Sequence, residues 1–152
     1  MTYESPRTCL NCNQTSWENP IPVVVAKVII GGGILLIRRA RDPGLGKLAF
    51  PGGYLEIGET WQEGMSRELR EETGLDIAPS LFRLDGIESS TDKERIIIFG
   101  RTPYLPSNII SEFTPNSEVS ELVITNQDTE LAFPTHTKAL SQYLVERNAR
   151  RY

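Results

Sequence analysis

The sequence predicts an α+β protein in which a β-sheet is flanked by helices, and three observations lead to this fold class. Short runs rich in β-branched residues, separated by glycines and prolines, predict strands that are mostly close in sequence. Two proline-free stretches with apolar residues three or four apart predict helices. The length of 152 residues, with 39% hydrophobic and 24% charged residues, is typical of one globular domain.

The first strands are expected between residues 22 and 40. The run VVVAKVII, three glycines and the run ILLIRRA predict a β-hairpin that turns at Gly31–Gly33. A short strand over residues 48–50 then runs into the sharp turn at residues 51–53, which reads Pro-Gly-Gly. Later strand-like runs occupy residues 81–90, 94–105 and 121–125.

Residues 60–72 predict the first helix. Thr60 is expected to cap its start, with Glu63 as the capping-box partner, and Gly74 to end it. The apolar side chains of this helix are four residues apart and predict a narrow stripe that faces the core. These residues are Trp61, Met65 and Leu69.

The last helix is expected over residues 135–147. It begins beside His136, the only histidine, for which we expect a capping or surface role. No Ser-His-Asp or Cys-His hydrolase could therefore be built without His136.

The charge balance limits the partners. A net charge of −4 and a pI of about 5.1 argue against a nucleic-acid binder, which would carry a basic face. The most apolar stretch, residues 21–37, is interrupted by Lys27 and three glycines, so we expect no membrane span. The N-terminus lacks an apolar signal core, and the cytoplasm is the expected location.

Acidic residues concentrate on the first predicted helix. Glu68 and Glu72 fall on one face of it, with Glu71 on the flank. Like charges at this spacing repel, and a hard cation such as Mg²⁺ or Mn²⁺ would relieve the repulsion. A solvated helix face would also explain the spacing alone. The glycines just before the helix favour a metal, because the backbone can approach closely there and offer a carbonyl.

A complete motif extends from Gly53 to Leu75. It reads Gly53, five residues, Glu59, seven residues, Arg67-Glu68-Leu69, one residue, Glu71-Glu72, one residue, Gly74-Leu75. This pattern resembles the Nudix box at every fixed position, and the chain is similar to the branch of Nudix hydrolases that acts on ADP-ribose or FAD. The resemblance implies a Nudix αβα sandwich with a mixed central β-sheet.

The resemblance also implies roles for individual residues. Glu59 and Arg67 match the pair whose salt bridge orients the catalytic helix. Glu118 sits where a later-loop glutamate binds metal or activates water, with Glu121 as a competitor. The implied metal ligands are the Gly52 carbonyl, Glu68, Glu71 and Glu72. The implied catalytic residues are Glu59, Arg67, Glu71 and Glu118.

The activity implied is metal-dependent hydrolysis of the pyrophosphate bond in a nucleoside diphosphate linked to another moiety. ADP-ribose or a dinucleotide such as FAD or NADH ranks first as the substrate. The alternatives are a house-cleaning nucleoside triphosphate pyrophosphohydrolase and a non-catalytic Nudix-fold binding or regulatory protein. The expected partner is a small-molecule nucleotide, without nucleic acid or membrane, and a homodimer is left open.

Residues 1–20 resemble the second half of a zinc ribbon, ahead of a Nudix domain over residues 21–152. Structural zinc takes four ligands, whereas this segment offers only Cys9 and Cys12. Three alternatives are open for this pair: a degenerate remnant, a Zn²⁺ site shared between two subunits, or a redox pair. We favour a degenerate remnant.

Overall fold

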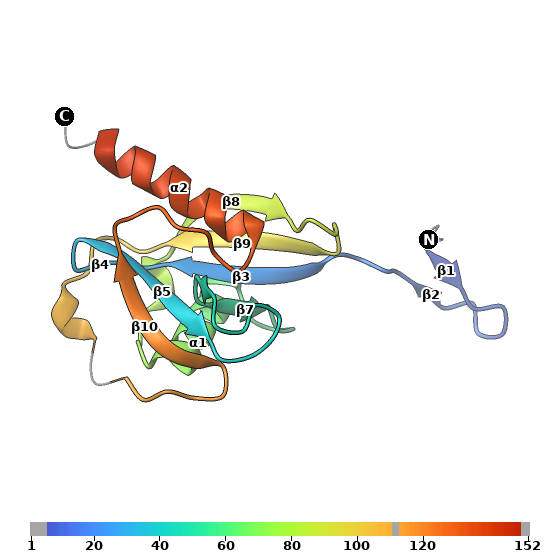
Figure 1. Ribbon diagram of the computed structural model, residues 1–152. Helices are drawn as coiled ribbons and strands as arrows, with labels where there is room; N and C mark the ends of the chain where they lie inside the picture. Colours follow the sequence, from blue (N-terminus) through green and yellow to red (C-terminus); the bar gives the residue numbers. More distant parts are fainter. Residues whose placement is uncertain (1–5, 111–112, 150–152) are drawn as a thin grey trace.

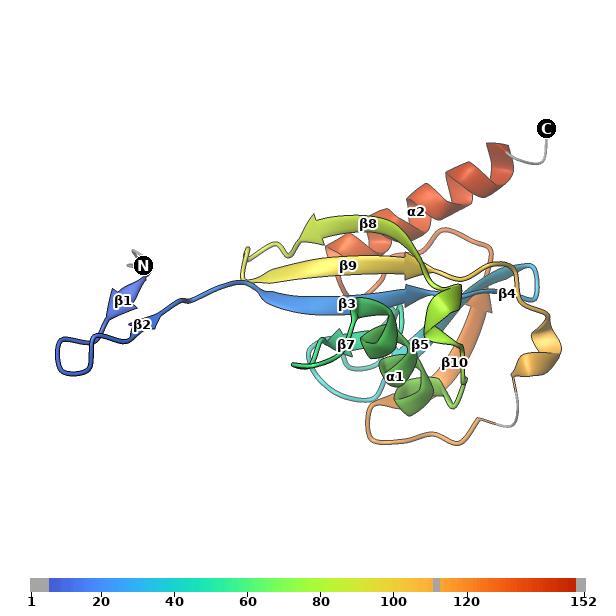
Figure 2. The ribbon, with the colours of Figure 1, turned by 180° about the vertical axis from the view of Figure 1, so that it is seen from behind.

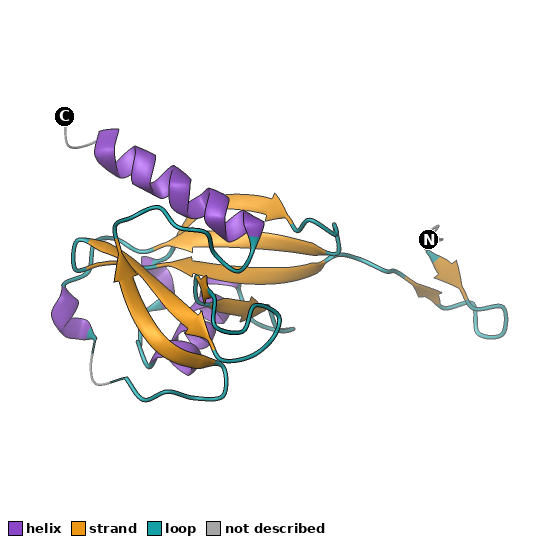
Figure 3. Ribbon diagram, in the orientation of Figure 1, coloured by secondary structure: helices purple, strands orange, loops and turns teal. Residues whose placement is uncertain are grey.

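The structure is a computed structural model that describes residues 6–110 and 113–149. Two β-sheets of four strands each pack between two α-helices, which confirms the predicted α+β sandwich (Figure 3). The strands are β1 (Arg7–Thr8), β2 (Thr15–Ser16), β3 (Ile21–Lys27), β4 (Ile29–Ile30), β5 (Gly33–Arg39), β6 (Leu48–Ala49), β7 (Gly52–Tyr54), β8 (Arg83–Ser89), β9 (Arg95–Arg101) and β10 (Val119–Thr125). The helices are α1 (Trp61–Thr73), α2 (Pro134–Ala149) and the short 3₁₀ turns η1 (Pro79–Leu81) and η2 (Ser107–Ile109).

The first sheet is mixed and has the strand order β7-β3-β9-β8. Strand β3 is parallel to β9, while β7 and β8 are antiparallel to their neighbours. The second sheet has the order β10-β5-β4, with β6 also paired to β5, and its pairs are antiparallel.

The predicted hairpin around the three glycines is wrong in part. Only the two residues of β4 turn back onto β5, whereas β3 belongs to the other sheet. The chain changes sheets at Val28, which is fully buried, while Lys27 before it is 5% exposed and Ile29 after it is half-buried. The apolar residues on the two sides of Lys27 give no signal of such a change, because both segments read as strands.

Alternate residues of β3 face the two helices, as the two-residue period of a strand requires. Val24 packs in the cluster that contains Met65 and Leu69 of α1. Val25 packs in the cluster that contains Leu140 of α2. The helices therefore cover opposite sides of the strands (Figure 1 and Figure 2).

Helix α1 has the ends that the sequence predicts. The Thr60 hydroxyl accepts a hydrogen bond from the Glu63 N–H, and a Glu63 carboxylate oxygen accepts from the Thr60 N–H at 2.7 Å. Gly74 ends the helix with a φ of 76°. Met65 and Leu69 are fully buried and Trp61 is half-buried, so the apolar stripe faces the core.

Strands β1 and β2 form a small hairpin that projects from the rest of the molecule (Figure 1). Cys9 and Cys12 lie in its turn as exposed free thiols. In the described part of the chain, no helix is both long and apolar enough to cross a membrane.

Candidate active site

Residues 51–53, the glycine turn, lead into β7 and bring backbone close to α1. A Cβ atom on Gly52 would overlap the carbonyl oxygen of Val24 on the paired strand β3. A Cβ atom on Gly53 would overlap the carboxylate of Glu68. Both glycines are therefore needed for the turn to sit between the sheet and the helix.

Glu72 is the most buried carboxylate of this region, at 4% exposed. One of its oxygens accepts a hydrogen bond from the Gly52 N–H at 2.8 Å. Burial raises the pKa of Glu72 to about 8, and the charges of Glu68 and Glu118 act in the same direction. Within residues 6–110 and 113–149, no lysine or arginine forms an ion pair with Glu72.

Arg67 connects α1 to the loop before it. Its Nη2 and Nε atoms donate to the two oxygens of Glu59 at 2.7 and 3.1 Å, and this bond lowers the pKa of Glu59. Nη1 donates to Glu68 at 2.8 Å, and Nη2 also donates to the carbonyl of Tyr54. Gly64 leaves room for this arrangement, since its Cβ would lie 2.7 Å from a Glu59 oxygen. The Glu59–Arg67 salt bridge expected from the sequence is thus present.

Glu71 and Glu118 lie at the edge of the same region. The Glu71 side chain is 58% exposed and lies 3.6 Å from Arg67 Nη1. Glu118 precedes β10, and its carboxylate pairs with Arg41 at 2.7 Å. Glu121, the competitor, instead pairs with Arg38 at 2.6 Å. The structure therefore brings Glu118, rather than Glu121, toward the helix carboxylates.

These groups border one cavity of about 1070 Å³, the main cavity. Its acidic residues include Glu68, Glu71 and Glu118, while the deeper Glu72 reaches the Gly52 backbone that lines the same space. We call Glu68, Glu71, Glu72 and Glu118 the acidic cluster.

Asn116 joins α1 to the Glu118 loop, a role that sequence reasoning missed. Its side-chain oxygen accepts from the N–H groups of Glu118 and Val119 at 2.8 and 2.9 Å. Its amide nitrogen donates to the carbonyls of Glu71 and Glu72 at 3.4 and 3.5 Å. Asparagine in a turn often bonds backbone two or three residues on, so the segment Asn-Ser-Glu-Val was the available signal.

His136 does not have the expected surface role and lies in the core at 6% exposed. His136 lies in the first turn of α2. Its Nδ1 accepts a hydrogen bond at 3.2 Å from the N–H of Phe50, the residue that follows β6. Burial lowers the pKa of His136 to about 3, so the imidazole is neutral. Through this hydrogen bond His136 holds Phe50, the residue directly before the glycine turn.

Arg39, at the end of β5, is a second residue missed by sequence reasoning. Its guanidinium lies 5.2 Å from the ring centre of Phe133, and Nε donates to the Pro43 carbonyl at 2.6 Å. Burial lowers the pKa of Arg39, while the nearby charges of Glu72 and Glu118 raise it. Arg39 lines the main cavity and forms no ion pair with another described residue. It can therefore offer donors to an anionic ligand.

The acidic cluster suits a hard divalent cation. Buried oxygen donors with mutually repelling charges are stabilised by such an ion. The charged form of Glu68 is disfavoured like that of Glu72, because burial also raises the pKa of Glu68. The Glu68 carboxylate also lies directly against the backbone of Gly53, because a Cβ atom there would overlap it. Across the described residues, no three acidic, histidine or cysteine side chains already stand in a metal-binding group, so some carboxylates must turn from their present partners.

Comparison with known proteins identifies the family. A family model for the NUDIX domain matches residues 20–142, most of the chain. This chain belongs to the Nudix family. The Nudix domain also has the fold of a Nudix hydrolase from Nitrosomonas europaea, with a TM-score of 0.80 and 25% identity over 95% of this chain and 81% of that one.

Two curated relatives match the Nudix domain more closely in sequence over shorter stretches. An ADP-ribose pyrophosphatase of Methanocaldococcus jannaschii is 48% identical over 61 residues, which are 40% of this chain and 35% of the relative. An 8-oxo-dGTP diphosphatase of Escherichia coli is 48% identical over 52 residues, which are 34% of this chain and 39% of the relative. The matches thus span little more than a third of each relative.

Proposed function

We propose that this Nudix domain hydrolyses the pyrophosphate bond of a nucleoside diphosphate linked to a second group, with a divalent cation as cofactor. The observation that carries the proposal is the pair of buried Glu72 and half-buried Glu68, held against the glycine turn beside a large cavity. The two curated relatives are named as an ADP-ribose pyrophosphatase and an 8-oxo-dGTP diphosphatase, which supports an activity at a phosphoanhydride bond.

Glu68, Glu72 and the Gly52 carbonyl would hold Mg²⁺ or Mn²⁺, with Glu71 and Glu118 at its edge. When bound, such an ion polarises the diphosphate and offsets charge on the leaving oxygen. Arg67 keeps the Glu68 carboxylate aimed at the turn, because it is itself fixed by two bonds to Glu59.

The remaining residues would handle the water and the phosphates. Glu71 and Glu118 are the two candidates to accept the proton of the attacking water, since both border the main cavity and are partly exposed. Arg39 would bind a phosphate oxygen through its free guanidinium nitrogens. Release of Glu118 from Arg41 would leave that arginine available for the same task.

ADP-ribose or a dinucleotide such as FAD or NADH is our first choice of substrate. The main cavity, at about 1070 Å³, exceeds the usual range of single small-molecule sites, and this favours a ligand with a group on each side of the diphosphate. A nucleoside triphosphate is the second candidate, supported by the equal identity to the 8-oxo-dGTP diphosphatase. The intact carboxylates argue against a purely binding role.

A substrate panel tests this proposal. ADP-ribose, FAD, NADH and nucleoside triphosphates are each incubated with Mg²⁺ or Mn²⁺, and the products are separated by chromatography. We expect two phosphate monoesters from ADP-ribose or a dinucleotide. Release of inorganic pyrophosphate from a triphosphate alone would instead select the second candidate, and no hydrolysis of any compound would refute the proposal.

Three expectations from the sequence stay predictions. They are the division into residues 1–20 and 21–152, a location in the cytoplasm, and a homodimer. The projecting β1–β2 hairpin supports the division, because it pairs only with itself.

A further inference from the structure

A second cavity of about 420 Å³ lies away from the acidic cluster, at the other end of the mixed sheet. Arg95 borders the main cavity and Arg101 borders the second one, at the two ends of β9. Six residues of extended strand separate them, about 20 Å. The two cavities therefore cannot hold the same small ligand.

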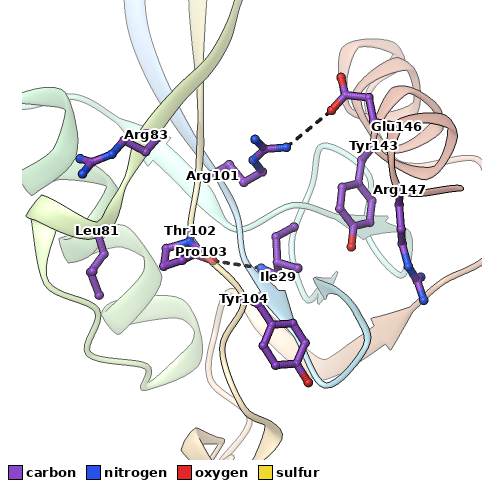
Figure 4. Close-up of a pocket in the computed structure, with 10 residues that line it drawn as sticks. All are labelled: Ile29, Leu81, Arg83, Arg101, Thr102, Pro103, Tyr104, Tyr143, Glu146 and Arg147. Atoms are coloured by element: carbon purple, nitrogen blue, oxygen red, sulfur yellow. Dashed lines mark hydrogen bonds and ion pairs between the residues drawn. The ribbon is translucent and has the colours of Figure 1, made fainter. Parts of the chain in front are cut away.

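The second cavity is walled by the end of β9, the segment after it and the last turns of α2. Figure 4 shows Tyr143 and Arg147 side by side on the helix wall, with Tyr104 facing them from the segment after β9. Thr102 fixes the floor, because its hydroxyl accepts a hydrogen bond from the Ile29 N–H at 3.0 Å. The cavity is thus formed by ordered secondary structure.

Positive charge gathers here on a chain whose net charge is −4. Lys27, Arg101 and Arg83 are register partners on three neighbouring strands, and like charges at such positions cost stability. Their counterions are few: Asp85 contacts both Lys27 and Arg101, and Glu146 lies 3.5 Å from Arg101. Arg83 turns away from the cavity (Figure 4), where it donates to the Ser80 carbonyl.

Arg147 adds a fourth cation and is half-buried on the cavity wall. It forms no ion pair with any residue that the structure describes. Asp85 and Glu146 balance the charges of Lys27 and Arg101, and Arg83 turns away, so Arg147 leaves one positive charge in excess at this concave site. Guanidinium groups in such a place bind phosphate oxygens through paired N–H donors.

An aromatic surface stands next to these cations. The Tyr104 side chain is 65% exposed at the mouth of the cavity, and Ile29 and Pro103 line the space beside it. An exposed tyrosine ring is a platform on which a nucleobase stacks. A ligand that has both a planar ring and a phosphate would contact the Tyr104 ring and Arg147 together.

We propose that the second cavity is a binding site for a nucleoside monophosphate, with the phosphate on Arg147 and the base against Tyr104. Its volume lies within the range of small-molecule sites. The proposal is independent of the activity at the acidic cluster, because no residue lines both cavities.

The test is a titration of the full chain with AMP in EDTA, followed by calorimetry and by backbone amide NMR shifts. We expect saturable binding with shifts at Ile29, Thr102 and Tyr104. Arg147→Gln and Tyr104→Ala should each weaken the affinity about tenfold. Lys138→Gln is the matched control, since it removes the same charge near the other end of α2 and should leave AMP binding unchanged.

Three outcomes would overturn the proposal. The first is absence of saturable binding, and the second is shifts confined to residues of the main cavity such as Gly53 and His136. The third is binding of inorganic phosphate as tight as that of AMP, which would mean that the base contributes nothing. Unchanged melting temperatures of Arg147→Gln and Tyr104→Ala ensure that lost affinity is not lost folding.

Discussion

The carboxylate of Glu72 accepts a hydrogen bond from the backbone N–H of Gly52 at 2.8 Å, and this contact joins the acidic helix to the glycine turn. A glutamine at position 72 keeps the shape and one acceptor oxygen but removes the charge. This substitution therefore tests the negative charge of Glu72 separately from its hydrogen bond to Gly52.

We expect Glu72→Gln to lower kcat by roughly a hundredfold to a thousandfold, a loss typical of removing a charge-stabilising group from an active site. The melting temperature should be unchanged or higher, because glutamine is neutral at every pH, whereas burial disfavours the charged form of Glu72. Steady-state kinetics and thermal unfolding measure both quantities. Glu121→Gln is the control, since Glu121 pairs with Arg38 outside the acidic cluster. Equal activity of the wild type and Glu72→Gln would show that Glu72 holds no metal.

The His136 imidazole gives a pH dependence of stability. Its pKa is about 3 in the folded protein and has an ordinary value of 6.5 when exposed. As the pH falls below 6.5, the unfolded chain takes up the proton first, so the free energy of unfolding decreases. We expect this group to account for about 2 kcal/mol of the loss between pH 7 and pH 5.

Urea unfolding of the wild type and His136→Gln at the two pH values isolates this contribution. Glutamine can still accept the hydrogen bond of the Phe50 N–H but does not titrate. The decrease from pH 7 to pH 5 should be smaller in the variant by that amount. Parallel decreases in both proteins would mean that His136 does not stay neutral in the folded state.

Arg39 should matter for binding of the substrate phosphates. We expect Arg39→Gln to lower kcat/KM about tenfold, mainly through KM, because a charged hydrogen bond to phosphate is lost. Arg39→Lys should recover part of the loss, since it restores the charge but not the guanidinium fork. Arg38→Gln is the matched control on the neighbouring position of β5. The assignment is wrong if Arg39→Gln leaves KM unchanged.

The cysteine pair of the N-terminal hairpin is expected to be dispensable. Cys9 and Cys12 are exposed free thiols in a hairpin that pairs only with itself. Replacing both with serine should change the melting temperature of the Nudix domain and its kcat very little. Melting curves and the zinc content of purified protein check this. One zinc per chain or per two chains, lost together with stability in the double variant, would show a working site.

Sequence reasoning predicted the local structure around the acidic cluster well. Thr60, Glu63 and Gly74 act at the ends of α1 through bonds to residues within four positions, so the signal is contained in the sequence itself. The Glu59–Arg67 bridge also spans only eight residues.

Features that depend on packing between distant segments were not predictable in this way. His136 meets Phe50 across 86 positions, and nothing near residue 136 indicates that contact. The change of sheet at Val28 was hidden because the segments before Lys27 and after Val28 are both rich in β-branched residues. In the sequence Arg39 is one of several basic residues. Only its burial beside Phe133 in the folded protein distinguishes it from them.

We propose that water attacks a phosphorus of the diphosphate at the acidic cluster. Hydrolysis in ¹⁸O-labelled water tests this step most directly. With ADP-ribose as substrate and Mg²⁺ or Mn²⁺ present, mass spectrometry of the products locates the label. We expect the products AMP and ribose 5-phosphate, with one ¹⁸O atom in the phosphate group of one of these products. Free adenine together with an intact diphosphate, or label on a sugar carbon, would contradict it.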